Sequence, residues 1–132
     1  VVMGHEIAHA VAGHGTERVS HQLLQQGGGV LASLLTEGSE YQAAILQVYG
    51  IGTQLGGILP YSRLHESEAD RMGLIFMAMA GYNPRASIDF WQRMQQAGGG
   101  APPEFLSTHP SGDTRIRDLR DYMPEALQYY RP

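Results

Sequence analysis

Apolar residues recur at helical spacing through most of the chain, and glycine and proline clusters interrupt them. The pattern predicts a first helix from Val1 to about Ala12, which glycines at 13 and 15 kink or end. A second helical pattern runs from Arg18 to Gln26, and we expect the glycine triplet at 27–29 to break it. No stretch of useful length alternates with the period of a strand, so the predicted fold class is mainly α.

The same pattern continues through the second half. Tyr41 to Leu59 carries no charge, but its glutamines and glycines make it too polar to span a membrane. We expect it to be a buried or partly exposed helix that Pro60 ends. Further helices are predicted over 61–80, from Pro84 to about Gln96, and from about Asp113 to Met123.

Composition narrows the class of protein. The 132 residues, of which 42% are hydrophobic and 17% charged, are enough for one domain with a single core. The net charge of -4 argues against nonspecific nucleic-acid binding, which needs a basic surface. Because the chain has no cysteine, it forms no disulfide, and a bound metal must have His, Asp or Glu ligands.

The first predicted helix contains the pattern H-E-x-x-H, which is formed by His5, Glu6 and His9. Residues four apart share one face of a helix, so the two imidazoles can bind one metal ion, while Glu6 beside them can hold a water. The surrounding apolar residues fit a buried active-site helix. The alternative is a helix that carries two surface histidines.

A catalytic zinc needs three protein ligands, and the predicted helix over 61–80 offers candidates for the third. Glu66 and Asp70 are four apart, so one can bind the metal while the other accepts the spare ring N–H of a ligand histidine. Glu68 faces away and is expected in solvent. The alternative is that Glu66 and Asp70 are surface charges paired with Arg63 or Arg71, and spacing alone leaves both interpretations open.

Four stretches extend this picture along the chain. They read G-H-E-I-A-H at 4–9, L-P-Y-S-R-L-H-E-S-E-A-D-R-M-G at 59–73, G-Y-N-P at 81–84 and P-P-E-F-L-S-T-H-P-S-x-x-x-R-I at 102–116. In these motifs the chain resembles the gluzincin metallopeptidases of peptidase family M48, which includes the HtpX, CAAX prenyl and Oma-type proteases. The soluble BepA-, LoiP- and Oma-like branch is the most similar.

The resemblance implies roles for five residues of the first two motifs. His5, His9 and Glu66 become the ligands of one Zn²⁺ per chain. Glu6 becomes the general base that activates water, and Asp70 the partner of a ligand histidine.

The last motif carries two further residues with implied roles. His109 lies near the metal in the family, where it donates to the oxyanion or, in some relatives, caps the zinc in a latent enzyme. Arg115 supports the oxyanion or braces the loop that carries His109. The remaining histidines, His14, His21 and His65, match no metal-binding position, and we expect them to be structural or surface residues.

The resemblance also implies an activity. It predicts a single zincin-like catalytic domain over 1–132, a fragment whose small sheet and substrate-binding edge strand lie upstream. The expected function is zinc-dependent hydrolysis of peptide bonds in unfolded or misassembled envelope proteins, in a bacterial periplasm or at a membrane reached through segments outside this chain. One alternative is a non-proteolytic, chaperone-like or scaffold module stabilised by zinc. Another is an apolar helix at 41–59 that contacts a membrane or a partner.

Overall fold

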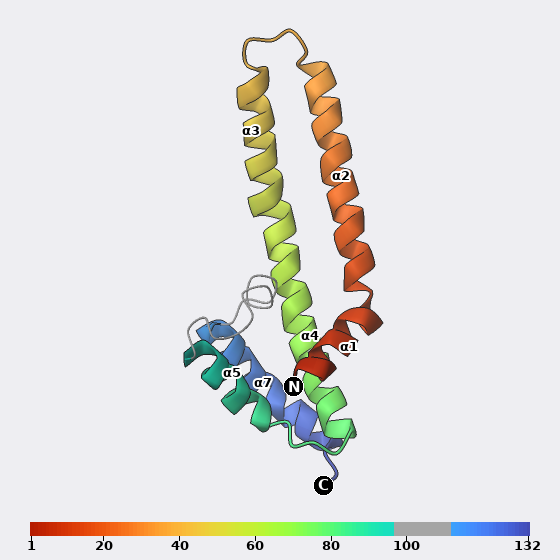
Figure 1. Ribbon diagram of the computed structural model, residues 1–132, viewed down its shortest axis with the longest axis vertical. Helices are drawn as coiled ribbons and strands as arrows, with labels where there is room; N and C mark the ends of the chain where they lie inside the picture. Colours follow the sequence, from red (N-terminus) through yellow and green to blue (C-terminus); the bar gives the residue numbers. More distant parts are fainter. Residues whose placement is uncertain (97–111) are drawn as a thin grey trace. The chain divides into compact units, whose positions relative to one another are not determined.

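The computed structural model describes residues 1–96 and 112–132 (Figure 1), so His109 lies outside the described residues. All regular secondary structure in these two ranges is helical, which confirms the predicted mainly α class. In order, the helices are α1 (Val2–Ala12), α2 (His14–Leu35), α3 (Gln42–Thr53), the π-helix η1 (Gln54–Ile58), α4 (Leu59–Met79), α5 (Ala86–Gln96) and α7 (Asp113–Tyr129).

The described residues form two compact units, one of residues 1–12 with 66–96 and 112–132, and one of residues 13–65. The first unit has its core between α4, α5 and α7. Four apolar residues of α7 recur at helical spacing and point into this core, as expected of an amphipathic helix. The buried apolar side chains are Leu74, Trp91, Ile116, Leu119, Met123 and Ala126.

Within this unit α1 lies against α4 in direct backbone contact. A Cβ atom added to Gly4 would lie 2.8 Å from the carbonyl oxygen of Gly73. Ala8 of α1 and Ala69 of α4 are fully buried. Because residues 66, 70 and 73 share one face of a helix, this contact also turns the two carboxylates of α4 toward α1.

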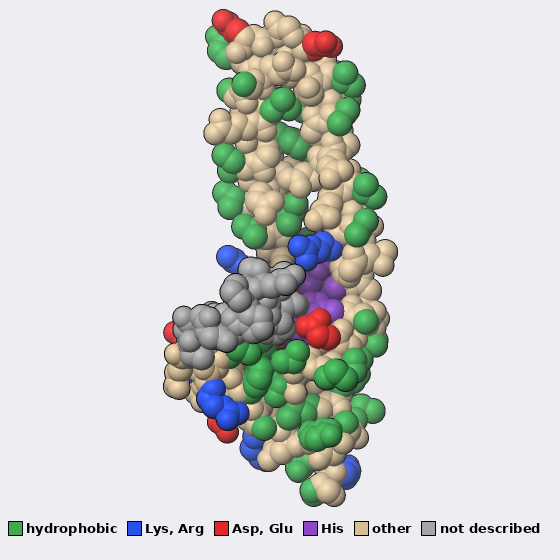
Figure 2. All heavy atoms as spheres, viewed as in Figure 1, with side chains coloured by type: hydrophobic (Ala, Val, Ile, Leu, Met, Phe, Trp, Pro, Cys, Tyr) green, Lys and Arg blue, Asp and Glu red, His purple; other side chains and the backbone are tan. Residues whose placement is uncertain are grey.

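The second unit contains α2 and α3, which lie side by side (Figure 1), together with η1 and the first residues of α4. The Tyr49 hydroxyl donates to the carbonyl oxygen of Gln25 at 3.0 Å, and the amide of Gln25 donates to Thr53 at 2.9 Å. Figure 2 shows apolar side chains along the surface of both helices. No helix of the described residues combines the length and the hydropathy that a membrane span requires.

The predicted helix break at 27–29 was wrong, because α2 runs without interruption from His14 to Leu35. The Tyr49 hydroxyl occupies the space in which a Gly28 side chain would lie. Packing of α3 on a surface without side chains therefore outweighs the low helix propensity of glycine. The predicted break at Gly13 is confirmed, since that residue has a φ of 74° between α1 and α2.

Pro60 does not end a helix, contrary to the prediction, and the last helix is longer than predicted. Pro60 is the second residue of α4 and follows the π-helix η1, whose wider turn accommodates a residue without an N–H. Helix α7 continues through Pro124 to Tyr129, beyond the predicted end at Met123. The buried contact of Ala126 lies in this extension and favours its helical conformation.

Candidate metal centre

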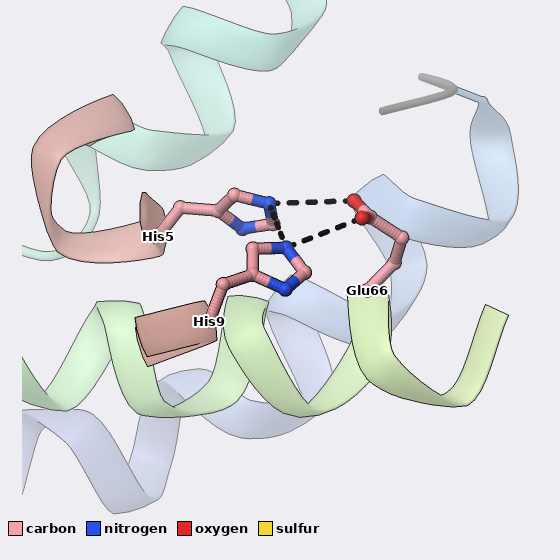
Figure 3. Close-up of side chains that lie close together, drawn as sticks. All are labelled: His5, His9 and Glu66. Carbon is pink, nitrogen blue, oxygen red and sulfur yellow. Dashed lines mark hydrogen bonds and ion pairs between the residues drawn. The ribbon is translucent and has the colours of Figure 1, made fainter. Parts of the chain in front are cut away.

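Three side chains from α1 and α4 meet at one point in the first unit (Figure 3). The Nε2 atoms of His5 and His9 are 3.0 Å apart. The carboxylate of Glu66 faces both rings, with Oε2 3.3 Å from His5 Nε2 and Oε1 3.2 Å from His9 Nε2. Among the residues that the structure describes, this is the group whose geometry fits a metal ion.

The contacts between the side chains of His5, His9 and Glu66 are close to the ligand spacing of a tetrahedral zinc site. Zinc binds imidazole nitrogen at about 2.0–2.1 Å and carboxylate oxygen at about 2.0–2.2 Å, which places neighbouring ligand atoms about 3.3 Å apart. The three observed distances of 3.0, 3.2 and 3.3 Å are close to that value. The two Glu66 distances belong to different oxygens of one carboxylate, so two imidazole nitrogens and one carboxylate group fit Zn²⁺ and leave a further position for water.

Asp70 lies one turn after Glu66 and faces the other nitrogen of His5. Its Oδ1 is 2.9 Å from His5 Nδ1, a contact that favours the proton on Nδ1 and so makes Nε2 the candidate metal donor. Burial lowers the pKa of His5, but hydrogen bonds to Asp70 and Glu66 outweigh that effect and raise the pKa above its ordinary 6.5. The carboxylates therefore favour positive charge at this position.

Arg115 reaches the same place from α7. Its side chain is buried, and its Nη2 donates to Asp70 Oδ1 at 2.5 Å. The guanidinium carbon lies 3.7 Å from the ring centroid of Trp91 on α5. Sequence reasoning missed Trp91, because it belongs to no motif and is 24 positions from Arg115.

Other charged residues of α4 lie as their helical positions suggest. Glu68 is exposed, as predicted. Arg71 pairs with Glu125 of α7 through two hydrogen bonds of 2.7 and 2.9 Å, so it does not neutralise Glu66 or Asp70. Glu6 is exposed on α1 between the two histidines.

The histidines without a predicted metal role lie in the second unit. The rings of His14 and His65 stack with centroids 4.1 Å apart, and His65 Nε2 is 2.8 Å from a carboxylate oxygen of Glu17. The ring of His21 lies against Tyr61, with centroids 4.3 Å apart. None of them joins the group of His5, His9 and Glu66 among the described residues.

Comparison with known proteins identifies the family. The model of peptidase family M48 matches residues 1–123. The chain belongs to peptidase family M48. The predicted family is therefore confirmed, and the M48 match includes both helices that carry the candidate metal ligands.

Several curated M48 relatives match over nearly the whole chain. It is 38% identical to mitochondrial metalloendopeptidase OMA1 of Arabidopsis thaliana, over 98% of this chain and 26% of that protein. For the protein of the same name in Schizosaccharomyces pombe, identity is 36% over 95% of this chain and 36% of the relative. A β-barrel assembly-enhancing protease of Yersinia pestis is 33% identical, over 91% of this chain and 26% of the relative. The chain thus spans about a quarter to a third of the length of these relatives, and no solved structure matches it.

Proposed function

We propose that this chain is the catalytic part of a zinc-dependent endopeptidase. The observation that carries the proposal is the convergence of the His5, His9 and Glu66 donor atoms, which all lie within 4.8 Å of one another. Glu6 lies next to His5 on α1. Membership of family M48 and relatives named metalloendopeptidases support the same activity.

In the proposed reaction His5, His9 and Glu66 hold the metal, which when bound supplies Lewis acidity for the attacking water and the scissile carbonyl. Glu6 accepts a proton from that water as it attacks, and then delivers the proton to the leaving amine. Asp70 keeps the proton of His5 on Nδ1. The resemblance assigns to His109 the hydrogen bond to the developing oxyanion. Water is consumed, and no covalent enzyme intermediate forms.

Metal content tests the proposed ligands, and proteolytic activity tests the proposed general base. We expect about one zinc per wild-type chain, and its loss in His5→Ala and Glu66→Gln, because three protein ligands are needed. His21→Ala is the matched control, since that ring lies against Tyr61, and it should keep the metal. Zinc that persists in Glu66→Gln would exclude this ligand set.

The role of Glu6 is tested in the intact protein with a casein-type substrate. Glu6→Gln is nearly isosteric but cannot accept the proton, so it should retain zinc and lose nearly all proteolysis. Full proteolysis by Glu6→Gln would refute the role as base. Wild-type zinc without proteolysis would favour the alternative of a zinc-stabilised, chaperone-like or scaffold module.

The proposed substrates are proteins or peptides, in particular unfolded or misassembled envelope proteins. The name of the β-barrel assembly-enhancing relatives supports this substrate class. A bacterial envelope location, periplasmic or membrane-associated, stays a prediction because other relatives are named as mitochondrial. Nucleic acid is not a proposed partner, since the net charge is -4.

A further inference from the structure

Behind the candidate metal ligands lies a chain of contacts, of which the sequence motifs imply only the one between Asp70 and a ligand histidine. Trp91 on α5 contacts Arg115 on α7, Arg115 contacts Asp70 on α4, and Asp70 contacts His5 on α1. The side chains of Arg115, Asp70 and His5 are 6%, 5% and 3% exposed. The contacts therefore connect the core of the first unit to a metal ligand without passing through solvent.

The geometry of Arg115 favours an action on Asp70. A single carboxylate oxygen, Asp70 Oδ1, accepts both from Arg115 Nη2 at 2.5 Å and from His5 Nδ1 at 2.9 Å. Arg115 Nη2 is nearer to His5 Nδ1, at 3.1 Å, than to His5 Nε2, at 3.4 Å, and it is 3.6 Å from Glu66 Oε2. Since a buried carboxylate is costly unless paired, this cation stabilises Asp70 in the position that orients His5.

Trp91 fixes the guanidinium from the opposite side. The indole is 1% exposed and belongs to the hydrophobic core, so its position is set by packing. A planar guanidinium stacks on an aromatic face, whereas a lysine ammonium has no comparable surface. Trp91 thus restricts Arg115 to the orientation in which Nη2 reaches Asp70.

We propose that Arg115, supported by Trp91, is a positioning residue that acts through Asp70 to orient His5 for zinc. This inference rests on the proposed function, since it assigns the second layer of the same metal site. It differs from a role in oxyanion support, because the guanidinium is engaged behind the ligand histidine.

The direction in which zinc affinity changes in a neutral variant of Arg115 distinguishes positioning of Asp70 from simple charge repulsion. A cation close to Zn²⁺ repels it, so by charge alone the neutral variant Arg115→Met should bind zinc more tightly. By positioning, the same variant should bind zinc more weakly, because Asp70 loses the partner that fixes it. Residues that orient a metal-bound histidine typically change metal affinity about 10–100-fold when removed.

The test is zinc affinity of this chain, measured by competition with a chromophoric chelator, beside the visible spectrum of the Co²⁺-loaded protein. We expect about tenfold weaker zinc binding and an altered Co²⁺ spectrum in Arg115→Met, with partial rescue by Arg115→Lys. Trp91→Phe keeps an aromatic face and should weaken binding less. Arg71→Met is the matched control, because it removes an exposed arginine–carboxylate pair of the same unit and should leave zinc affinity unchanged.

A double-mutant cycle with Asp70→Asn tests the route. If Arg115 acts through Asp70, Arg115→Met should add little to the effect of Asp70→Asn. Full additivity would overturn the inference, as would unchanged or tighter zinc binding in folded Arg115→Met. If Arg115→Met does not fold, as judged by circular dichroism, folded Arg115→Lys decides, and its unchanged affinity would overturn the inference. Absence of zinc from the wild type would instead refute the proposed function, and this inference with it.

Discussion

Gly4 of α1 and Gly73 of α4 form the backbone contact that positions the candidate ligands, and Gly4→Ala tests it. The added Cβ would lie 2.8 Å from the Gly73 carbonyl oxygen, about 0.6 Å short of the 3.4 Å at which ordinary contacts begin. Both partners are helical backbone, so no side chain can move to relieve the overlap. The two helices must separate by several tenths of an ångström.

Two opposing contributions set the change in the free energy of unfolding of Gly4→Ala. Replacing glycine by alanine inside a helix stabilises it by up to about 1 kcal/mol, while overpacking of a close contact costs about 1–3 kcal/mol. We expect Gly4→Ala to lower the free energy of unfolding by about 1 kcal/mol. Zinc affinity should be more sensitive than stability, because metal–ligand distances tolerate deviations of only about 0.2 Å. The separation of the helices moves His5 and His9 relative to Glu66. At least a roughly tenfold loss of zinc affinity should result.

Gly27→Ala provides the control for this prediction. Gly27 lies within α2, and a Cβ atom there meets nothing within 4 Å. Its alanine variant should gain up to about 1 kcal/mol and keep the zinc affinity of the wild type. Urea denaturation in the presence of a chelator measures the free energy of unfolding of the metal-free protein, and competition with a chelator measures the zinc affinity. A Gly4→Ala protein as stable as Gly27→Ala, with unchanged zinc affinity, would refute the backbone contact.

Three further predictions follow from single contacts. Asp70→Asn should weaken zinc binding about 10–100-fold in a chelator competition, because a neutral amide replaces the charged carboxylate that accepts from the His5 N–H. A zinc affinity equal to that of the wild type would show that the 2.9 Å contact between Asp70 and His5 does not support metal binding. Glu125→Gln should flatten the acid limb of stability. A hydrogen bond from Arg71 lowers the pKa of Glu125 below 4.5, so this stabilisation is present above pH 4.5 and is lost as the pH falls through the lower folded-state value. Urea denaturation between about pH 3 and 7 measures the slope, and an identical slope in the variant would count against the pair. Tyr49→Phe should lower the free energy of unfolding by about 0.5–1.5 kcal/mol, because it removes the bond to Gln25, and a thermal melt unchanged by the variant would exclude that contribution.

The parts of the site that the sequence predicts are those set by helical spacing. His5 and His9 share a face because they are four apart, and the same argument places Glu66 and Asp70 together. Spacing could not decide which carboxylate faces the histidine Nε2 atoms. That choice depends on the rotation of α4 against α1, which the contact at Gly73 fixes.

Helix ends were predicted less well, and for one physical reason. The glycine triplet at 27–29 and Pro60 were interpreted through local propensity, whereas α2 and α7 are continued by contacts with distant residues. Gly28 provides a surface without a side chain for Tyr49, a residue 21 positions later. The extension past Pro124 coincides with burial of Ala126. Neither contact leaves a local pattern in the sequence.

In the candidate metal centre, different residues set the positions of the ligand atoms and the affinity for the metal. The close approach of α1 and α4 depends on small residues at their contact, and it sets the distance from the histidines to Glu66. These small residues are Gly4, Ala8, Ala69 and Gly73. The buried carboxylate of Asp70, 2.9 Å from His5 Nδ1, then contributes to how strongly the site attracts a cation. A substitution among the small residues should therefore change the coordination geometry reported by Co²⁺ together with affinity. Neutralising Asp70 should also reduce affinity and alter the Co²⁺ spectrum, because it releases the orientation of the His5 ring although the helix contact still places its backbone.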